Sequence, residues 1–521
     1  MKRYLIKLKK NLKFEFLLLL ILGALTSLSL PPFNFLIINF LTLSIFFGFL
    51  FKRLNRQFPK RFFFYYGWFF GFSYFLSSLY WISISLTFDK DFNFLIPISL
   101  ILIPSFLALF YGLITLFFYL FNPKNILSAF FLFSFLFGII EFVRGTIFSG
   151  FPWNLIVYSF SESLNFISII SVIGTYSLNL IIISFYTIPT LYILRSSNKD
   201  TVVCISLLFL SVIFFIYGIL QQKKFKNYTV KENPYTIRII GSNVSLDRFY
   251  NNTDAEDVIN ELISISSPEK KRKIFFIWPE GIIPNTYQDE FNLYRDITSK
   301  HFDENHLIGL GITSREIKNN KSKYYNSFSV FDHNFNLIDN YKKINLVPFG
   351  EFLPFESILD KVGLKVITNN IGSFDKGKER KIIEIKQNSQ QLKFLPLICY
   401  EIIYSGNLTK NFNFDFILNI SEDGWFGKSI GPKQHFAHSI FRAIESGKYL
   451  VRASNNGIAA IINPLGQIEK KINYGVSGYI DFINRKDLDK TIFSTFGNKI
   501  FILLILLYIF LIFSFNRFRN E

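Results

Sequence analysis

The chain has 521 residues, half of them hydrophobic, and a formal net charge of +18 at pH 7. The apolar residues are concentrated towards the two ends, which excludes an ordinary soluble globular protein. The positive charge does not indicate a nucleic-acid partner, because much of it flanks the apolar runs, where anionic lipid is the usual partner.

Long apolar runs fill most of the N-terminal part of the chain. A bilayer core about 30 Å thick needs about 20 apolar residues per helix. Runs of this kind lie near residues 16–30, 35–51, 62–88, 94–121, 126–142, 166–194, 202–220 and 500–515. One run alone would fit a buried core helix, but so many in succession leave little soluble protein to bury them. The sequence therefore predicts a polytopic α-helical membrane bundle of about eight spanning helices.

The basic residues beside these runs predict the orientation, because short cytoplasmic loops retain positive charge. With eight crossings, one side of the membrane receives Lys2, Arg3, Lys7, Lys9, Lys10, Lys13, Lys52, Arg53, Arg56, Lys60, Arg61, Arg195, Lys199, Arg517 and Arg519. The opposite loops carry little charge apart from Lys90 and Arg144. We therefore expect both termini in the cytoplasm and the block 223–483 outside it.

Between residues 235 and 483 the sequence changes to short strand-like runs separated by polar turns. We expect strands at 236–241, 273–278, 306–313, 326–332, 392–398, 416–421, 450–454 and 458–463, and helices at 255–265 and 432–446. The lysine- and asparagine-rich stretch 301–325 is expected to be a solvated loop region. This pattern predicts an α/β domain and divides the chain into 1–222 with seven transmembrane helices, 223–490, and 491–521 with the eighth helix and a cytoplasmic tail.

Two segments place charged side chains at the ends of apolar strands, where α/β sheets usually build their sites. Residues 276–281, Phe-Ile-Trp-Pro-Glu-Gly, end in Glu280, which would suit a general base. A strand-end glutamate that faces water is the alternative. Residues 341–351 carry Lys342, Lys343 and Glu351, and an ammonium there would stabilise an oxyanion. A solvated lysine pair is the commoner fate of Lys-Lys.

Only two cysteines occur, and we do not expect them to pair, since Cys204 lies in the seventh apolar run and Cys399 in the polar block. A free thiol has a pKa near 8.5, so little thiolate forms at neutral pH unless a base or cation acts on it. Glu280 would take the proton, and Lys343 with nearby backbone N–H groups would hold the charge that develops on a carbonyl oxygen. A small buried cysteine without chemistry is the alternative.

Taken together and in this order, the three motifs resemble those of the nitrilase superfamily, whose Glu-Lys-Cys triads act on carbon–nitrogen and acyl bonds in an αββα sandwich. The match extends into residues 419–427, 431–435 and 452–457. Such a domain between a seventh and an eighth spanning helix resembles the apolipoprotein N-acyltransferase family, and this resemblance covers nearly the whole chain. It implies an extracytoplasmic α/β nitrilase-like sandwich over residues 223–490 in a protein of the bacterial inner membrane.

The resemblance also implies roles, residue by residue. Glu280 would be the base, Lys343 the oxyanion stabiliser and Cys399 the nucleophile, and the supporting residues would be Glu351, Tyr400 and Glu401. The Tyr-x-Lys spacing of the family selects Lys343 over Lys342. The chain departs from the family at Glu422 and Gly424, where relatives commonly have asparagine and alanine, and in the loosened segment 241–244.

In the membrane part, Glu141, Arg144 and residues 150–153, Gly-Phe-Pro-Trp, match the family pattern at the outer end of the fifth helix. Charges at such depth are expensive and usually paired or functional. One interpretation is a local ion pair between Glu141 and Arg144, and the other is contact with a phospholipid headgroup. Trp153 and Trp425 are further candidates for contact with lipid or substrate, although an interfacial anchor would also explain Trp153.

His435 and His438 have a spacing that suits two metal ligands on one helix, but no third ligand is evident and structural histidines are favoured. The sequence contains no Walker loop and no convincing dinucleotide fingerprint, so we expect no cofactor and no metal.

The resemblance implies transfer of a fatty acyl chain from a membrane phospholipid, through a cysteine thioester, to the N-terminal α-amino group of a diacylglyceryl-modified lipoprotein. One alternative is a membrane-anchored amidase of the same superfamily, with water as the second nucleophile. The other is a transporter or receptor whose soluble domain binds a ligand without chemistry. About eight spanning helices favour lipid substrates, because one helix would suffice to anchor an amidase.

Overall fold

The computed structural model describes residues 2–54, 59–250, 253–318, 321–354, 373–387 and 390–517. Arg56 and Arg519, two of the basic residues that predict the orientation, lie outside this set. The chain folds into two compact units. The helical unit contains Met1–Thr87, Asn93–Gln221 and Thr495–Glu521, and the α/β unit contains Phe88–Phe92 and Gln222–Ser494.

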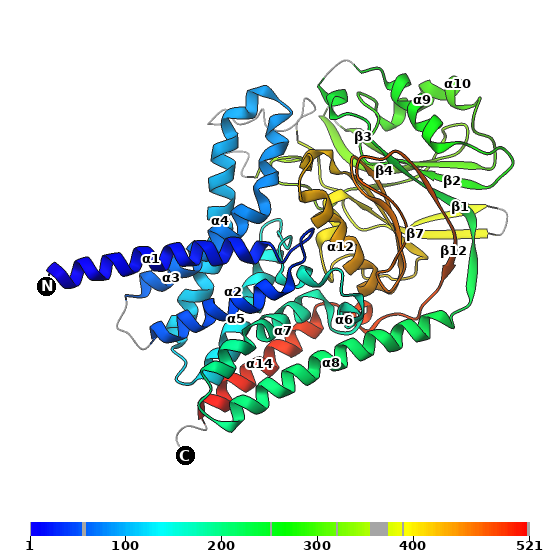
Figure 1. The fold of residues 1–521 in the computed structure, drawn as a ribbon. Coiled ribbons are helices and arrows are strands. Elements are labelled where there is room, and N and C mark those ends of the chain that lie inside the picture. The colour runs from blue at the N-terminus through cyan, green and yellow to red at the C-terminus, as the bar shows by residue number, and fades with distance from the viewer. Residues whose placement is uncertain are drawn as a thin grey trace. The chain divides into compact units, whose positions relative to one another are not determined.

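The helical unit consists of long apolar helices, which are α1 (Lys2–Ser27), α2 (Leu36–Leu54), α3 (Lys60–Leu79), α4 (Ile96–Phe121), α5 (Ile126–Thr146), α7 (Ile170–Ile193), α8 (Asn198–Lys226) and α14 (Lys499–Arg517). Shorter pieces of this unit are η1 (Tyr80–Thr87), η3 (Ile156–Phe160) and α6 (Leu164–Ile167), while η2 (Lys90–Leu95) and α13 (Ile492–Phe496) each span a point where the chain passes from one unit to the other. In Figure 1, α14 lies beside α5 and α7, which precede it by more than 300 residues.

Within the described residues, seven helical segments are long and apolar enough to cross a membrane. They correspond to the expected runs from the second to the eighth. The first expected run falls in α1, which is not among the seven. The finding confirms a multi-pass membrane protein.

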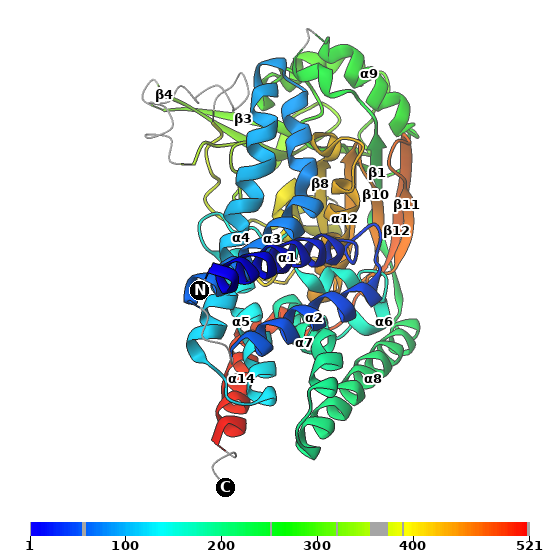
Figure 2. The same ribbon diagram turned by 60° about the vertical axis from the view of Figure 1, so that its left-hand side comes forward.

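The strands of the α/β unit are β1 (Val230–Ser242), β2 (Ile274–Ile277), β3 (His306–Lys318), β4 (Lys321–Phe331), β5 (Leu337–Lys342), β6 (Ile383–Gln387), β7 (Gln390–Ile398), β8 (Phe416–Glu422), β9 (Tyr449–Asn455), β10 (Ala459–Ile462), β11 (Ile468–Ile472) and β12 (Gly478–Lys486). They are joined in the order β5-β4-β3-β2-β1-β9-β8-β7-β6, with β10 on β9, β11 on β10 and β12 on β1. Figure 2 shows β1, β10, β11 and β12 side by side.

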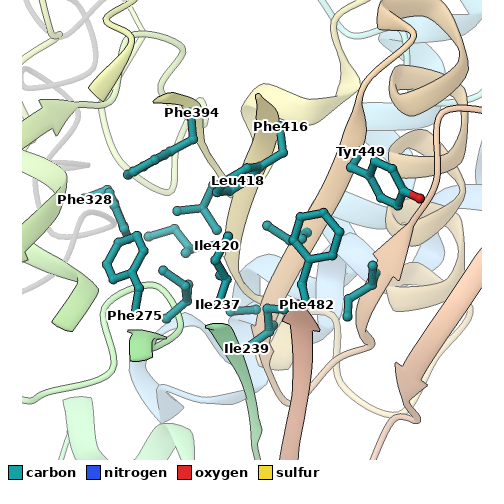
Figure 3. Close-up of a cluster of buried hydrophobic side chains, with 14 of the residues drawn as sticks. Ile237, Ile239, Phe275, Phe328, Phe394, Phe416, Leu418, Ile420, Tyr449 and Phe482 are labelled. Carbon is teal, nitrogen blue, oxygen red and sulfur yellow. The ribbon is translucent and has the colours of Figure 1, made fainter. Parts of the chain in front are cut away.

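The two halves of this strand order face each other across a shared apolar core. Figure 3 shows Phe275 and Phe328 from the first half against Phe394 from the second, and the rings of Phe275 and Phe394 lie 5.7 Å apart. On the outer face of the first half, α9 (Ala255–Ser266) packs in a second cluster with residues of β2 and β3. On the second half, α12 (Gly431–Ser446) contacts β9 and β10. These layers form the expected αββα sandwich.

Two expectations for this unit were wrong or incomplete. The stretch 301–325 is not a solvated loop, because most of it forms the antiparallel hairpin of β3 and β4. Alternating side chains face the core there, while Lys323 is exposed. The strands β5, β6, β11 and β12 were not predicted.

The direction of the parallel strands indicates at which end of the sheets a site is expected. The strands β1, β2 and β3 run parallel to one another, as do β7, β8 and β9. Their carboxyl ends therefore carry the turns that follow β2, β7 and β8. Open α/β sheets bind their ligands at such ends.

Candidate active site

Glu280 lies in the turn after β2 and is 7% exposed, so it does not face water. Its Oε1 accepts hydrogen bonds from Asn326 Nδ2 at 2.8 Å and Lys343 Nζ at 3.2 Å. Its Oε2 accepts one from the backbone N–H of Glu422 at 3.0 Å. A glycine is required opposite, because a Cβ on Gly311 of β3 would lie 2.4 Å from the Glu280 Cα.

Lys343 follows β5 and is 1% exposed. Its Nζ lies 2.9 Å from Glu351 Oε1 and 3.2 Å from Glu280 Oε1. Burial lowers the pKa of Lys343, but the two carboxylates outweigh burial and raise the pKa overall, so the side chain is an ammonium. Lys342 instead pairs with Glu316 outside this cluster. Neighbouring residues of an extended chain point to opposite faces, which separates the two lysines.

Asn326 of β4 joins the two carboxylates, and sequence reasoning missed it. Its Nδ2 donates to Glu280 Oε1 at 2.8 Å and to Glu351 Oε1 at 2.7 Å. Its backbone oxygen accepts the N–H of Lys343 at 2.8 Å. Glu351 is fixed further by the N–H of Val347, at 2.8 Å from its Oε2. Asn326 is the sixth residue of β4, a strand with several other polar residues, so its sequence offered no signal.

Cys399 is buried in the turn after β7, and its φ of +49° is unusual for a residue with a Cβ. Burial and the Glu280 carboxylate raise the pKa of the Cys399 thiol well above its usual value, while the Lys343 ammonium lowers it. The structure therefore brings Glu280, Lys343 and Cys399 into one electrostatic cluster. The thiol is neutral in this state and needs a base.

Glu401 holds the segments that carry the cysteine and the lysine together. Its Oε2 accepts from the N–H of Ile398 at 2.9 Å, and its Oε1 accepts from the N–H groups of Ile344 at 2.8 Å and Asn345 at 3.1 Å. The Tyr341 hydroxyl donates to the same carboxylate at 2.8 Å. Arg380 supplies the counter-charge at 2.6 Å. Tyr400 is buried against Tyr404, with ring centroids 5.5 Å apart.

His435 of α12 lies behind the cysteine. Its Nε2 is 3.2 Å from the carbonyl oxygen of Cys399, and its Nδ1 lies 2.9 Å from Asp423 Oδ1 and 3.0 Å from Arg452. Burial and Arg452 lower the pKa of His435, although Asp423 opposes them. The ring donates to the Cys399 carbonyl when Nε2 carries the proton, and to Asp423 when Nδ1 carries it. The structure describes no group of three potential metal ligands around His435 or elsewhere in its described residues.

The remaining candidates lie in two other clusters. In the helical unit, Glu141 and Arg144 form a buried ion pair, with Arg144 Nε 2.7 Å from Glu141 Oε2. Arg144 also donates to the carbonyl of Phe151. Trp153 is buried with its ring 5.0 Å from that of Trp81.

In the α/β unit, Trp425 is partly exposed and belongs to an aromatic group. Its ring is stacked on Phe249 at 5.5 Å and meets Phe88 edge-on at 5.9 Å. The turn after β8 joins the cluster of Glu280, Lys343 and Cys399 to this aromatic group, since Glu422 contacts Glu280 and Trp425 follows three residues later.

The cluster has the parts of a nucleophilic site. It contains a thiol on a tight turn, a carboxylate fixed at both oxygens, and an ammonium whose position is set by two acids. A carboxylate can remove the thiol proton, and an ammonium can stabilise an oxyanion. Such a set supports acyl transfer through a covalent intermediate.

Two family models match separate parts of the chain. Residues 22–188 match the apolipoprotein N-acyltransferase N-terminal domain, and residues 260–480 match carbon-nitrogen hydrolase. The apolipoprotein N-acyltransferase of Rickettsia bellii is 34% identical over 504 residues, covering 95% of this chain and 96% of the relative. That of Rhodopseudomonas palustris is 32% identical over 481 residues, covering 89% of this chain and 88% of the relative.

Solved structures of nitrilase-superfamily amidases are also similar. An amidase from Nesterenkonia sp. aligns with 53% of this chain and 98% of its own chain, with 12% sequence identity and a TM-score of 0.33.

Proposed function

Because the chain belongs to the apolipoprotein N-acyltransferase family and is therefore an enzyme of lipoprotein N-acylation, we propose that it moves a fatty acyl chain from a membrane phospholipid to a diacylglyceryl-modified lipoprotein. The acceptor atom is the N-terminal α-amino nitrogen of that lipoprotein. The same family membership argues against the amidase and the ligand-binding transporter. The observation that carries the proposal is the convergence of Glu280, Lys343 and Cys399 on one buried cluster.

In the first half of the reaction, the Cys399 sulfur attacks the ester carbonyl carbon of the phospholipid. Glu280 takes the thiol proton, which the raised pKa of the thiol keeps on sulfur in the free enzyme. The developing oxyanion lies against the Lys343 ammonium. The carbon–oxygen bond of the ester then breaks, and the proton passes from Glu280 to the departing alkoxide. The products are a Cys399 thioester and a lysophospholipid.

In the second half, the neutral α-amino nitrogen of the lipoprotein attacks the thioester carbonyl. Glu280 accepts a proton from this nitrogen, and the carbon–sulfur bond breaks as the amide forms. The proton returns to the sulfur, so the enzyme ends as it began. One carboxylate serves both halves, and Asn326 and the N–H of Glu422 hold its two oxygens in place.

In this scheme Glu351 and Glu401 do not contact the substrate but hold other residues of the site in position. Glu351 aims the Lys343 ammonium, at 2.9 Å, and Glu401 ties the segment after Lys343 to the residue before Cys399. Tyr400 supports the turn of the cysteine. Glu141, Arg144, Trp153 and Trp425 are proposed to serve lipid or substrate binding, the first two through the loop that Arg144 holds.

We also propose the setting of the reaction. The chain divides into a membrane domain of residues 1–222, a catalytic domain of residues 223–490, and a last helix and tail in 491–521. The catalytic domain lies on the periplasmic side of a bacterial inner membrane, as the basic flanks predict. Both lipid substrates then reach the thiol without leaving the bilayer, which avoids a cost of about 0.8 kcal/mol per CH₂.

The test is to trap the intermediate. Purified full-length enzyme is incubated with a phospholipid of defined acyl chains, and the peptide that contains Cys399 is analysed by mass spectrometry. We expect a mass increase of one acyl group, and its loss when a diacylglyceryl lipopeptide with a free amine is added. Cys399→Ala should abolish both the adduct and the triacylated product.

The outcome also separates the alternatives. An amidase would lose the acyl group to water at the same rate with or without the lipopeptide. A binding protein would form no adduct. A triacylated product formed by Cys399→Ala at the wild-type rate would contradict the proposal.

A further inference from the structure

A second ion pair lies beside the triad, and the reaction scheme gives it no role. Arg248 and Glu422 are 1% and 2% exposed, and a nitrogen of the guanidinium lies 2.5 Å from Glu422 Oε2. Arg248 lies in the short 3-10 turn η4 (Leu246–Phe249) after β1, and Glu422 is the last residue of β8. Burying two charges is costly unless their hydrogen bonds are satisfied. Their contacts therefore indicate what the pair holds.

Arg248 donates hydrogen bonds to three backbone carbonyls. One nitrogen donates to Val244 at 3.3 Å and to Ser245 at 2.9 Å. The other donates to the carbonyl of Gly281 at 3.2 Å, as well as to Glu422. Gly281 is the residue directly after Glu280 and has a φ of +51°. Arg248 thus fixes the backbone of Gly281, the residue that follows the proposed base Glu280.

Glu422 fixes the other side of the same base. Its backbone N–H donates to Glu280 Oε2 at 3.0 Å. Its carboxylate accepts from the N–H of Gly424 at 2.8 Å and from Asn455 Nδ2 at 2.7 Å. These bonds hold the end of β8 in the place that this N–H requires. The ion pair joins the two supports of Glu280 into one frame.

We propose that Arg248 and Glu422 form a positioning pair that aims the Glu280 carboxylate at its reaction partners. The proposal rests on the role of Glu280 as the base of the proposed function. Glu280 Oε1 has Asn326 and Lys343 as partners, and Oε2 has the N–H of Glu422. The pair is linked to the base by the backbone N–H of Glu422 on Glu280 Oε2 and by the Arg248 bond to the carbonyl of Gly281, so it acts by positioning Glu280. Loss of the pair lets the carboxylate move, and a misplacement of about 1 Å can cost about 100-fold in rate.

The test compares Arg248→Met, Glu422→Gln and the double variant with the wild type. In full-length purified enzyme, the acylation rate of Cys399 by phospholipid is measured under single-turnover conditions over a range of phospholipid concentration. We expect Arg248→Met to lose about 100-fold in the maximal rate with little change in the half-saturating concentration. Glu422→Gln keeps the side-chain shape and should lose less.

The double variant supplies a readout that is specific to the pair. Arg248→Met leaves the Glu422 carboxylate buried without its cation, whereas the double variant removes both charges. We therefore expect the combined loss of rate to be clearly smaller than the product of the two single losses. A loss in the double variant equal to the product of the two single losses would mean that each residue acts alone. That result would contradict the proposed positioning pair.

Arg238→Met is the matched control. Arg238 of β1 is also 1% exposed, donates to the carbonyls of Ser266 and Ser267, and pairs with Asp481 at 2.8 Å, but it has no contact with Glu280. It should lower the melting temperature to a similar extent and leave the acylation rate of folded enzyme unchanged. Equal rate losses in Arg238→Met and Arg248→Met would mean that the Arg248–Glu422 pair only stabilises the fold and does not position Glu280.

The wild type decides the underlying function separately. Absence of the acyl adduct in wild-type enzyme would reject the proposed function, whatever the variants do. A normal adduct in the wild type together with wild-type kinetics in Glu422→Gln and Arg248→Met would reject only the positioning pair. If Arg248→Met does not fold, Glu422→Gln alone carries the test, because glutamine preserves the volume at this position.

Discussion

Lys342 and Lys343 are chemically identical neighbours whose surroundings assign them different roles. Lys343 is buried between the carboxylates of Glu280 and Glu351, whereas Lys342 lies at a partly exposed ion pair with Glu316. The ammonium of Lys343 is therefore fixed next to the thiol. Exposed pairs such as that of Lys342 contribute only about 0–1 kcal/mol.

This difference predicts opposite outcomes for the same substitution. Lys343→Met should lower the acylation rate of Cys399 by about 100- to 1,000-fold, because the oxyanion loses its charged donor. Lys342→Met should leave that rate close to the wild-type value. Both rates are measured by single-turnover acylation with the same phospholipid, with circular dichroism to show that each variant is folded. A larger loss of rate in Lys342→Met than in Lys343→Met would show that the oxyanion is stabilised by Lys342 and not by Lys343.

Individual residues also show the limit of sequence reasoning. Glu280, Lys343 and Cys399 were predicted as site residues because each belongs to a short motif with a recognisable neighbour. Asn326 was missed because its role depends on a contact with residues 46 positions before and 25 positions after it in the chain. An asparagine in the middle of a strand carries no local sign of such partners.

At the scale of elements, α12 carries two buried histidines into the α/β unit. Burial lowers the pKa of both His435 and His438, and nearby arginines lower them further. In the unfolded chain a histidine has a pKa of about 6.5. Below that pH the unfolded state binds more protons than the folded state, so stability falls as the pH falls.

We therefore expect the stability of the enzyme to decline as the pH drops below about 6.5, by up to about 1.4 kcal/mol per pH unit for each histidine. Thermal unfolding of the purified enzyme between pH 8 and pH 5 measures the decline. His438→Gln should make the decline shallower, because glutamine does not titrate. Parallel curves for wild type and His438→Gln would show that this histidine does not contribute.

The strands also explain which elements the sequence predicts. Every expected strand overlaps an observed one. Strands such as β2 and β8 are buried along their whole length, so their sequences are apolar runs that can be recognised. Of the missed strands, β11, Ile-Glu-Lys-Lys-Ile, is mostly exposed, and β5 has one buried residue among exposed and half-buried ones. Their pairing depends on a neighbouring strand rather than on their own hydrophobicity, so composition gives no signal.

At the scale of the whole molecule, the number of membrane crossings decides where the termini lie. The described residues contain seven candidate spans, and α1 would be an eighth. Polar contacts indicate that α1 crosses beside α2 in the opposite direction. Near the end of α1, Thr26 donates to Thr42 at 2.8 Å, and in the middle of α1 Glu15 pairs with Arg53 at the end of α2.

A buried carboxylate such as that of Glu15 is costly in a membrane unless it is paired. Its second partner is the hydroxyl of Tyr66 in α3, at 2.8 Å. These contacts bind α1 to two helices that are themselves candidate spans. An α1 that lay on the membrane surface would lose them. We therefore expect eight crossings, which place both termini on the same side of the membrane.

Cysteine labelling tests this count. In a Cys204→Ala, Cys399→Ala background, single cysteines are introduced by Lys2→Cys, Asn520→Cys and Lys410→Cys, the last at an exposed position of the α/β unit. In spheroplasts, a membrane-impermeant maleimide should label Lys410→Cys directly. The two terminal variants should react only after the membrane is opened, because the basic flanks keep the ends in the cytoplasm. If α1 did not cross, one terminal cysteine would react in intact spheroplasts and the other would not, and the argument from the Glu15 and Thr26 contacts would fail with it.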